Sequence, residues 1–305
     1  MSEFAVEVRS LSKSYGHVKA LDDITFSTGK GELFGFIGPD GAGKTTLFRI
    51  LATLLLADSG EAQVEGLDVV RDFGKIRKLI GYMPGRFSLY QDLTVEENLR
   101  FFATIFGTTI EANYDLIRDI YIQIEPFKNR RAGKLSGGMK QKLALSCALI
   151  HKPAVLFLDE PTTGVDAVSR REFWEMLQRL KQQGISILVS TPYMDEASLC
   201  DRVALIQDGS IMTISTPAEV VESYPLELFS VTSDNLYGLM SELKSWPGAA
   251  SVFAFGQAAH LACSRGTIRR EELAGFLGQK GHRNVKIESI RPNIEDCFME
   301  LMQKR

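Results

Sequence analysis

A glycine-rich stretch near the N-terminus has the residue types that bind a polyphosphate. The stretch GPDGAGKTT, residues 38–46, directly follows the apolar run 33–37 and matches the pattern G-x-x-x-x-G-K-[ST]. Glycines let main-chain N–H groups approach phosphate oxygens, and the start of a helix adds a partial positive charge. We therefore predict a nucleotide site, the phosphate loop, formed by Gly38, Pro39, Asp40, Gly41, Ala42, Gly43, Lys44, Thr45 and Thr46. Lys44 is predicted to reach the terminal phosphates, and the Thr45 hydroxyl to ligate Mg²⁺.

Two neighbouring carboxylates, Asp159 and Glu160, end a second apolar run in the stretch VLFLDEP. Two acids at the end of a strand are often only part of a solvated turn. Downstream of a phosphate loop, such an acidic pair also suits phosphoryl transfer. We expect Asp159 to hold Mg²⁺ through water and Glu160 to act on the attacking water.

The elements that must carry these residues alternate short apolar runs with helical patterns from residue 1 to about 223, which predicts a layered α/β domain. We predict buried strands at 33–37, 155–158 and 185–189, and a helix directly after the first of them. Residues 84–150 read as mostly helical, with a capping box at Thr94–Glu97, and we interpret them as a helical insert.

After residue 225 the pattern predicts the order βαββαβα, in which the last helix begins near Pro292. This order suits a small two-layer α+β domain. The predicted division is therefore an α/β domain that carries the phosphate loop over residues 1–224 and an accessory domain over residues 225–305.

Composition narrows the classes of function. The net charge of −3 and the absence of basic clusters argue against a nucleic-acid partner. The apolar runs are too short to cross a bilayer, and we expect no signal peptide at the N-terminus. The four cysteines lie far apart and have no metal-ligand spacing, so we expect reduced thiols.

The stretch KLSGGMKQ, residues 134–141, resembles the signature loop of the ABC ATPases, and it precedes the acidic pair at that family's distance. The resemblance covers residues 1 to about 222 and implies a P-loop ATPase domain with a mixed sheet, which binds ATP and Mg²⁺. In the family two such domains dimerise head to tail around ATP. The resemblance therefore implies that Ser136, Gly137, Gly138 and Gln141 act on the partner's ATP. It also implies that Tyr15 stacks on adenine and that Asp166 touches the opposite subunit.

The stretches GYMPGRFSLYQDLTVEENL and DEPTTGVDAVSRREFW are similar to the ABC-2 type subgroup, as is the C-terminal ending RPNIEDCFMELM. This resemblance implies an ATPase that powers drug or lipid efflux together with a separate integral membrane permease. It places the chain in the cytoplasm, peripheral on the inner face of the cell membrane. The dimer partner is either a second copy or another ABC ATPase. The region 85–92 is the expected contact with the permease, with Phe87 and Tyr90 either anchoring that contact or packing inside the insert.

Two positions depart from the family pattern at the γ-phosphate. Gly85 stands where the family usually has a Gln, and Pro192 stands where it usually has a His. Three interpretations are open: slow hydrolysis with Glu160 alone, substitution by Tyr193 or Arg86, or pairing with a different ATPase subunit. We favour the first because Glu160 is retained. A subunit that binds ATP with little turnover, and a soluble ABC ATPase outside transport, are the alternative functions.

Overall fold

The structure is a computed structural model that describes residues 3–266 and 270–303. The chain divides into two compact units, Met1–Pro217 and Ala218–Arg305. Each unit contains a hydrophobic core cluster drawn from its own residues alone. The sequence pattern places the change of domain after residue 224, and that boundary stays a prediction.

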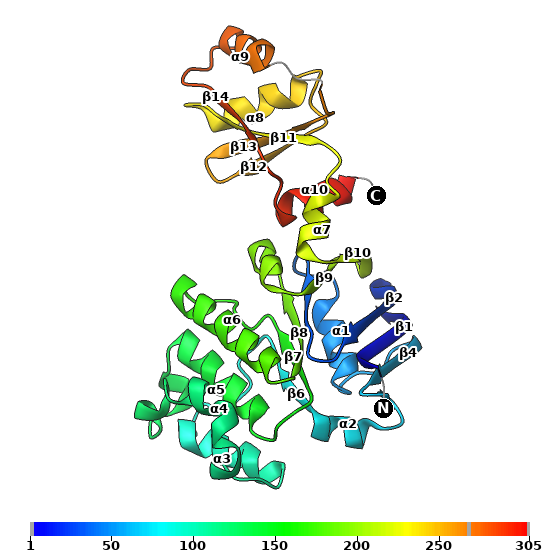
Figure 1. The fold of residues 1–305 in the computed structure, drawn as a ribbon, viewed down its shortest axis with the longest axis vertical. Helices are drawn as coiled ribbons and strands as arrows, with labels where there is room; N and C mark the ends of the chain where they lie inside the picture. Colours follow the sequence, from blue (N-terminus) through cyan, green and yellow to red (C-terminus); the bar gives the residue numbers. More distant parts are fainter. Residues whose placement is uncertain (1–2, 267–269, 304–305) are drawn as a thin grey trace. The chain divides into compact units, whose positions relative to one another are not determined.

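A six-stranded sheet forms the centre of the first unit, in the order β10-β9-β3-β8-β7-β6 (Figure 1). Its strands are parallel except β10, which pairs antiparallel with β9. Three of them, β3, β7 and β8, confirm the three buried strands predicted from the sequence. The bounds are β3 Leu33–Ile37, β6 Ile80–Met83, β7 Val155–Asp159, β8 Ser186–Thr191, β9 Arg202–Gln207 and β10 Ser210–Ser215.

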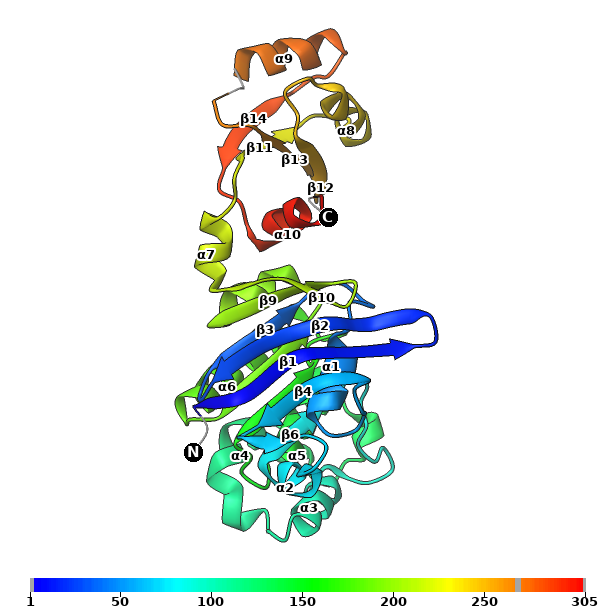
Figure 2. The same ribbon diagram turned by 90° about the vertical axis from the view of Figure 1, so that its right-hand side faces the viewer.

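A second, antiparallel sheet has the order β2-β1-β4-β5, and its long strands are prominent in Figure 2. Helix α1 packs between the two sheets and contacts β2, β4 and β7. Four phenylalanines, Phe26, Phe34, Phe36 and Phe48, form successive ring contacts through this core. The bounds are β1 Phe4–Tyr15, β2 Val18–Gly29, β4 Ser59–Val64, β5 Leu67–Asp68, α1 Lys44–Leu51 and α2 Phe73–Leu79.

Helices and 3-10 turns fill the chain between β6 and β7 and gather on one side of the sheet (Figure 1). The capping box is confirmed, because the Thr94 hydroxyl accepts from the Glu97 N–H at 3.2 Å and the Glu97 carboxylate accepts from the Thr94 N–H at 2.7 Å. The helices of this region are α3 Val95–Ile105, η1 Glu111–Asn113, α4 Tyr114–Tyr121, η2 Glu125–Phe127, η3 Ala132–Lys134 and α5 Gly137–Leu149. Those that follow it are α6 Ala167–Gln182, η4 Met194–Leu199 and α7 Pro217–Glu222.

The second unit has the predicted order βαββαβα, built on an antiparallel sheet β12-β13-β11-β14. Leucines of α8 and α9 form its core together with apolar residues of the sheet. The second helix of this order corresponds to α9; the sequence pattern predicts that this helix begins at residue 268, and residues 268 and 269 lie outside the described residues. The bounds are β11 Glu227–Thr232, α8 Leu236–Ser245, β12 Ser251–Phe255, β13 Ala258–Cys263, α9 Arg270–Gln279, β14 Lys286–Ile290 and α10 Ile294–Gln303.

All four cysteines are free and buried. In the part of the chain that the structure describes, no helix has both the length and the hydropathy that a membrane span needs.

Candidate functional site

The phosphate loop connects the carboxyl end of β3 to α1. Gly43 precedes the helix with φ +98°, and a Cβ atom there would lie 2.3 Å from the Ala20 carbonyl oxygen, so only glycine fits. The Gly38 N–H donates to the Thr191 carbonyl at 3.3 Å, which fixes the start of the loop to the end of β8. The predicted strand–loop–helix arrangement is therefore present.

Lys44 is the buried cation of this loop, with 2% of its surface exposed. Its Nζ donates to the carbonyls of Gly38 at 2.7 Å and Pro39 at 2.9 Å, and lies 3.3 Å from Glu160 Oε1. A buried ammonium needs such partners to offset its lost hydration. The cation is therefore held between the phosphate loop and the acidic pair.

Asp159 and Thr45 bring together two oxygens suited to Mg²⁺. The Thr45 hydroxyl donates to Asp159 Oδ1 at 3.1 Å, and Asp159 is only 2% exposed. Mg²⁺ prefers carboxylate and hydroxyl oxygens and is often held by only one or two protein groups beside substrate phosphates. The donor set at this position fits the predicted metal.

Glu160 has a left-handed main chain, with φ +50°. For a residue other than glycine this conformation costs about 1–3 kcal/mol and persists only where neighbours fix it. Its N–H donates to both the hydroxyl and the carbonyl oxygen of Ser190, at 3.0 Å and 3.1 Å. Backbone strain of this kind often accompanies a functional side chain.

Ser190 is a site residue to which the sequence motifs gave no role. Its buried hydroxyl donates to Asp159 Oδ1 at 2.7 Å and accepts from the Glu160 N–H, so one side chain orients both acids. The available signal was a pair of small hydroxyl residues, Ser190 and Thr191, at the end of an otherwise apolar strand.

The two departures from the family pattern lie against this same site. A Cβ atom on Gly85 would lie 3.1 Å from the Asp159 carbonyl oxygen and 3.7 Å from the Glu160 Cβ. Pro192 follows Thr191, whose carbonyl holds the start of the phosphate loop. The Arg170 guanidinium lies over the Tyr193 ring, with its Cζ 4.9 Å from the ring centroid.

The signature loop and the loop that ends at Asp166 lie side by side, each at the start of a helix. Ser136 caps α5 by accepting from the Met139 N–H, while Asp166 caps α6. A Cβ atom on Gly138 would lie 2.7 Å from Ser169 Oγ, so the two helix starts are in close contact. Main-chain N–H groups of Ser169 and Val168, together with the Ser169 hydroxyl, hold the pKa of the Asp166 carboxyl below its usual value.

Tyr15 and Gln141 are the remaining predicted residues. Tyr15 ends β1 with 47% of its surface exposed, and the Lys13 ammonium lies 5.9 Å from its ring centroid. Gln141 lies on α5 and lines an apolar groove. Their proposed contacts with adenine and with a partner's ATP stay predictions.

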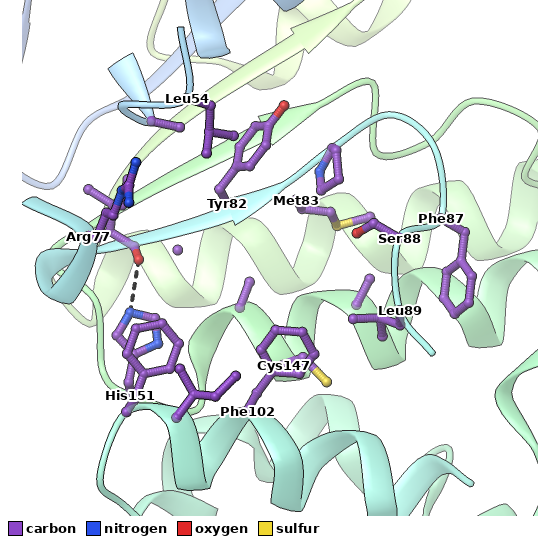
Figure 3. A pocket seen from close by; sticks show the side chains of 18 of the residues that line it. Leu54, Arg77, Tyr82, Met83, Phe87, Ser88, Leu89, Phe102, Cys147 and His151 are labelled. Atoms are coloured by element: carbon purple, nitrogen blue, oxygen red, sulfur yellow. Dashed lines mark hydrogen bonds between the residues drawn. The ribbon is translucent and has the colours of Figure 1, made fainter. Parts of the chain in front are cut away.

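This groove has a volume of about 350 Å³ and lies between the end of β6, the loop 84–89, α3 and α5. Figure 3 shows Tyr82 and Met83 across it from Phe102 and His151. His151 stacks on Phe106, and its Nε2 lies 2.9 Å from the Ile80 carbonyl oxygen. Burial lowers the pKa of His151 below its usual value, so this imidazole stays neutral at pH 7.

A family model, curated relatives and solved structures all point to one family of proteins. A family model described as "ABC transporter" matches residues 21–163. The probable multidrug ABC transporter ATP-binding protein YbhF of Escherichia coli is 41% identical over 220 residues, which cover 72% of this chain and 38% of that protein. The chain thus spans well under half of that relative's length.

Two further matches cover most of the matched protein or chain. The Nod factor export ATP-binding protein I of Burkholderia orbicola is 37% identical over 305 residues, covering 99% of this chain and 98% of that protein. The solved structure of cbiO1 from Clostridium perfringens, part of the ABC transporter complex cbiONQ, aligns with a TM-score of 0.65 at 26% identity, covering 73% of this chain and 92% of that chain. The chain is thus related along nearly its whole length to a known ATP-binding protein, and its fold brings the phosphate loop and the acidic pair together. These findings show that this chain belongs to the ATP-binding proteins of ABC transporters.

Proposed function

We propose that this chain hydrolyses ATP and thereby powers the export of a drug or lipid through a separate membrane subunit. The observation that carries the proposal is the meeting of the phosphate loop with the acidic pair: Lys44 Nζ lies 3.3 Å from Glu160 Oε1, and Thr45 Oγ1 lies 3.1 Å from Asp159 Oδ1. The names of the relatives, which refer to multidrug transport and Nod factor export, support an export role.

In the proposed hydrolysis of ATP, each residue of the site has a separate role. Bound Mg²⁺ supplies positive charge that offsets the charge of the phosphates. Thr45 and Asp159 hold the metal, the N–H groups of the phosphate loop and Lys44 bind the phosphate oxygens, and Glu160 orients the attacking water and accepts its proton. Ser190 holds Asp159 and the main chain of Glu160 in place.

Gly85 and Pro192 make this a slow ATPase. Neither residue has a side-chain hydrogen-bond donor to offer the γ-phosphate or the water. Losing one preorganised donor commonly costs about 10²–10³ in rate. Glu160 therefore carries the hydrolysis, and nucleotide binding is retained because the phosphate loop is complete.

The test compares the purified chain with its Glu160→Gln variant. We expect calorimetry to detect Mg·ATP binding by both proteins, and phosphate release by the parent alone. Equal phosphate release from the two proteins would overturn the hydrolytic proposal and leave a subunit that binds ATP and gates a partner. Absence of ATP binding by the parent would overturn both.

Two such subunits, either two copies or one copy with another ABC ATPase, are proposed to close around ATP. The exposed Ser136 and the loop that ends at Asp166 lie at neighbouring helix starts, so one surface can present both to a partner. Sedimentation of the Glu160→Gln variant tests this: we expect a dimer with ATP and a monomer after Ser136→Arg is added. A dimer that persists with Ser136→Arg would contradict it.

The permease is proposed to insert a short apolar segment into the groove of Figure 3, which would hold the chain on the inner face of the membrane. The groove is mainly apolar, and two of its residues, Leu54 and Ile105, are each 58% exposed. Pro84 lines the groove, and the next residue, Gly85, lies against the acidic pair. A segment bound in the groove can therefore shift the chain beside Asp159 and Glu160 and change the rate of hydrolysis.

Charge substitution of an exposed groove residue tests the contact. We expect Ile105→Glu to abolish co-purification with the membrane subunit from detergent-solubilised membranes, while ATP binding is kept. Ile122→Glu is the matched control, since Ile122 is 56% exposed and does not line the groove. Equal recovery of the membrane subunit with both variants would exclude this surface.

A further inference from the structure

Glu196 is a buried carboxylate just beyond Pro192 to which no sequence motif assigned a role. It lies on η4 with 2% of its surface exposed. Its Oε2 accepts from the Thr191 hydroxyl at 2.5 Å, and its Oε1 accepts from the Thr162 hydroxyl at 2.8 Å. Arg170 Nε lies 3.8 Å from Oε1. A carboxylate buried this deeply is stable only with such partners, so the arrangement is specific.

One of these partners, Thr191, links Glu196 to the phosphate loop. The Thr191 hydroxyl also accepts from the Tyr193 N–H at 3.0 Å, so it closes the turn around Pro192. The Thr191 carbonyl accepts from the Gly38 N–H at 3.3 Å. Glu196 therefore fixes the residue that joins this turn to the first glycine of the phosphate loop.

The other hydroxyl partner, Thr162, links Glu196 to the acidic pair. Thr162 is 1% exposed and lies two residues after Glu160, in the turn that leads to α6. In that turn the Thr163 N–H donates to the Glu160 carbonyl, and the Val165 N–H donates to the Thr162 carbonyl, both at 3.2 Å. The two oxygens of one carboxylate thus hold the two chain segments that flank the site of hydrolysis.

We propose that Glu196 is a positioning residue for ATP hydrolysis, which sets the turn at Pro192 and the turn after Glu160 at a fixed spacing. This inference rests on the proposed function. Glu196 acts through Thr191 and Thr162 and needs no contact with the nucleotide. Because a displacement of about 1 Å can cost about 100-fold in rate, this spacing governs kcat more than nucleotide affinity.

The threonines give the cleaner test, since valine has nearly the same shape as threonine and lacks the hydroxyl. We expect Thr191→Val and Thr162→Val each to lower kcat at least tenfold, while Kd for Mg·ATP stays within threefold of the parent value. Thr191→Ser and Thr162→Ser restore the hydroxyl and are expected to keep kcat within threefold. Rates are taken per nucleotide-binding site counted by calorimetry, so partial unfolding does not imitate the effect.

Variants of Glu196 complete the test. Glu196→Gln, which keeps the shape and one of the two acceptor oxygens, is expected to retain more of kcat than Glu196→Ala. Asp195→Asn is the matched control, because Asp195 is the neighbouring acid, pairs with the same Arg170 at 3.2 Å, and is 67% exposed at its side chain. In the double variant Glu196→Ala/Thr191→Val the two losses are expected to be less than additive, as for residues that act through one contact.

The outcomes separate this inference from the function on which it rests. A parent chain that binds or hydrolyses no ATP overturns the proposed function and this inference with it. An active parent whose Thr191→Val and Thr162→Val variants keep kcat within twofold overturns the inference alone. If Glu196→Ala does not fold, the threonine variants still decide the question.

Discussion

Replacement of Ser190 by alanine tests whether one hydroxyl organises both acids. The change removes the donor to Asp159 Oδ1 at 2.7 Å and one of the two acceptors of the Glu160 N–H. The Ser190 carbonyl still accepts from that N–H at 3.1 Å, so the larger loss falls on Asp159. A hydrogen bond to a charged group contributes about 1.5–3 kcal/mol. If the transition state loses all of it, kcat falls about 10- to 150-fold.

The assay is steady-state ATP hydrolysis at several Mg²⁺ concentrations. We expect Ser190→Ala to raise the Mg²⁺ concentration that gives half the maximal rate, because Asp159 is less well held beside Thr45. Ser186→Ala is the matched control: Ser186 lies on the same face of β8, is 2% exposed, and accepts from the Gly31 N–H at 3.0 Å, four residues before Ser190. Both variants lose one buried hydroxyl, so they should lose similar thermal stability.

Two results would refute this reasoning. The first is a Ser190→Ala variant with the parent's kcat and Mg²⁺ dependence. The second is a Ser186→Ala variant with an equal loss, which would mean that the effect comes from weakening the strand. Only a loss specific to Ser190, accompanied by a changed Mg²⁺ dependence, fits a role in orienting Asp159.

Four further predictions concern other parts of the chain. Lys142 on α5 lies 2.7 Å from Glu172 on α6, so Lys142→Glu should lower the free energy of unfolding by about 1–3 kcal/mol in urea titration, with partial recovery in Lys142→Glu/Glu172→Lys. Because the pKa of Asp166 is lowered, its contribution to stability is present above about pH 4 and lost as the pH falls through the folded-state value. The stability gap between parent and Asp166→Asn, measured by thermal unfolding, should therefore close below about pH 4. Residues 1–217 expressed alone should fold and bind ATP but dimerise more weakly in sedimentation, and unchanged dimerisation would count against a role for the second unit. Pro192→His should raise kcat at least tenfold over Pro192→Ala by adding a donor, and equal rates would place residue 192 out of reach of the γ-phosphate.

The parts of the site that sequence reasoning found are those encoded by neighbours in the chain. The phosphate loop, the strand before it and the capping box at Thr94 each depend on residues within about ten positions. The contacts of Ser190 with Asp159 and of Glu196 with Thr162 span 31 and 34 positions. No local pattern indicates such contacts, because they arise where the ends of β7 and β8 meet in the folded sheet.

The antiparallel sheet of the first unit escaped prediction for a related reason. Strands β1 and β2 are each 12 residues long, and their pairing includes several register shifts. These irregularities break the strict alternation of apolar and polar residues that identifies a half-buried strand. Gln141 lies on α5 and lines the apolar groove, and its predicted contact with a partner's ATP stays a prediction.

Proline at position 192 fits the turn after β8, because the hydrogen bonds that hold this turn do not use the main-chain nitrogen of residue 192. Proline disfavours helical conformations in the residue before it, and Thr191 is the last residue of a β-strand. The bonds around Pro192 use the carbonyl and hydroxyl of Thr191 and the N–H of Tyr193, none of which requires a proton on the proline nitrogen. Losing the histidine of the family pattern therefore removes a side-chain donor and leaves the turn intact. With proline at 192, the side chain at this position cannot hold the turn through a contact with the nucleotide. We therefore expect such a chain to depend more heavily on the Glu196 carboxylate, which bonds the Thr191 hydroxyl, than a chain in which histidine contacts the nucleotide directly.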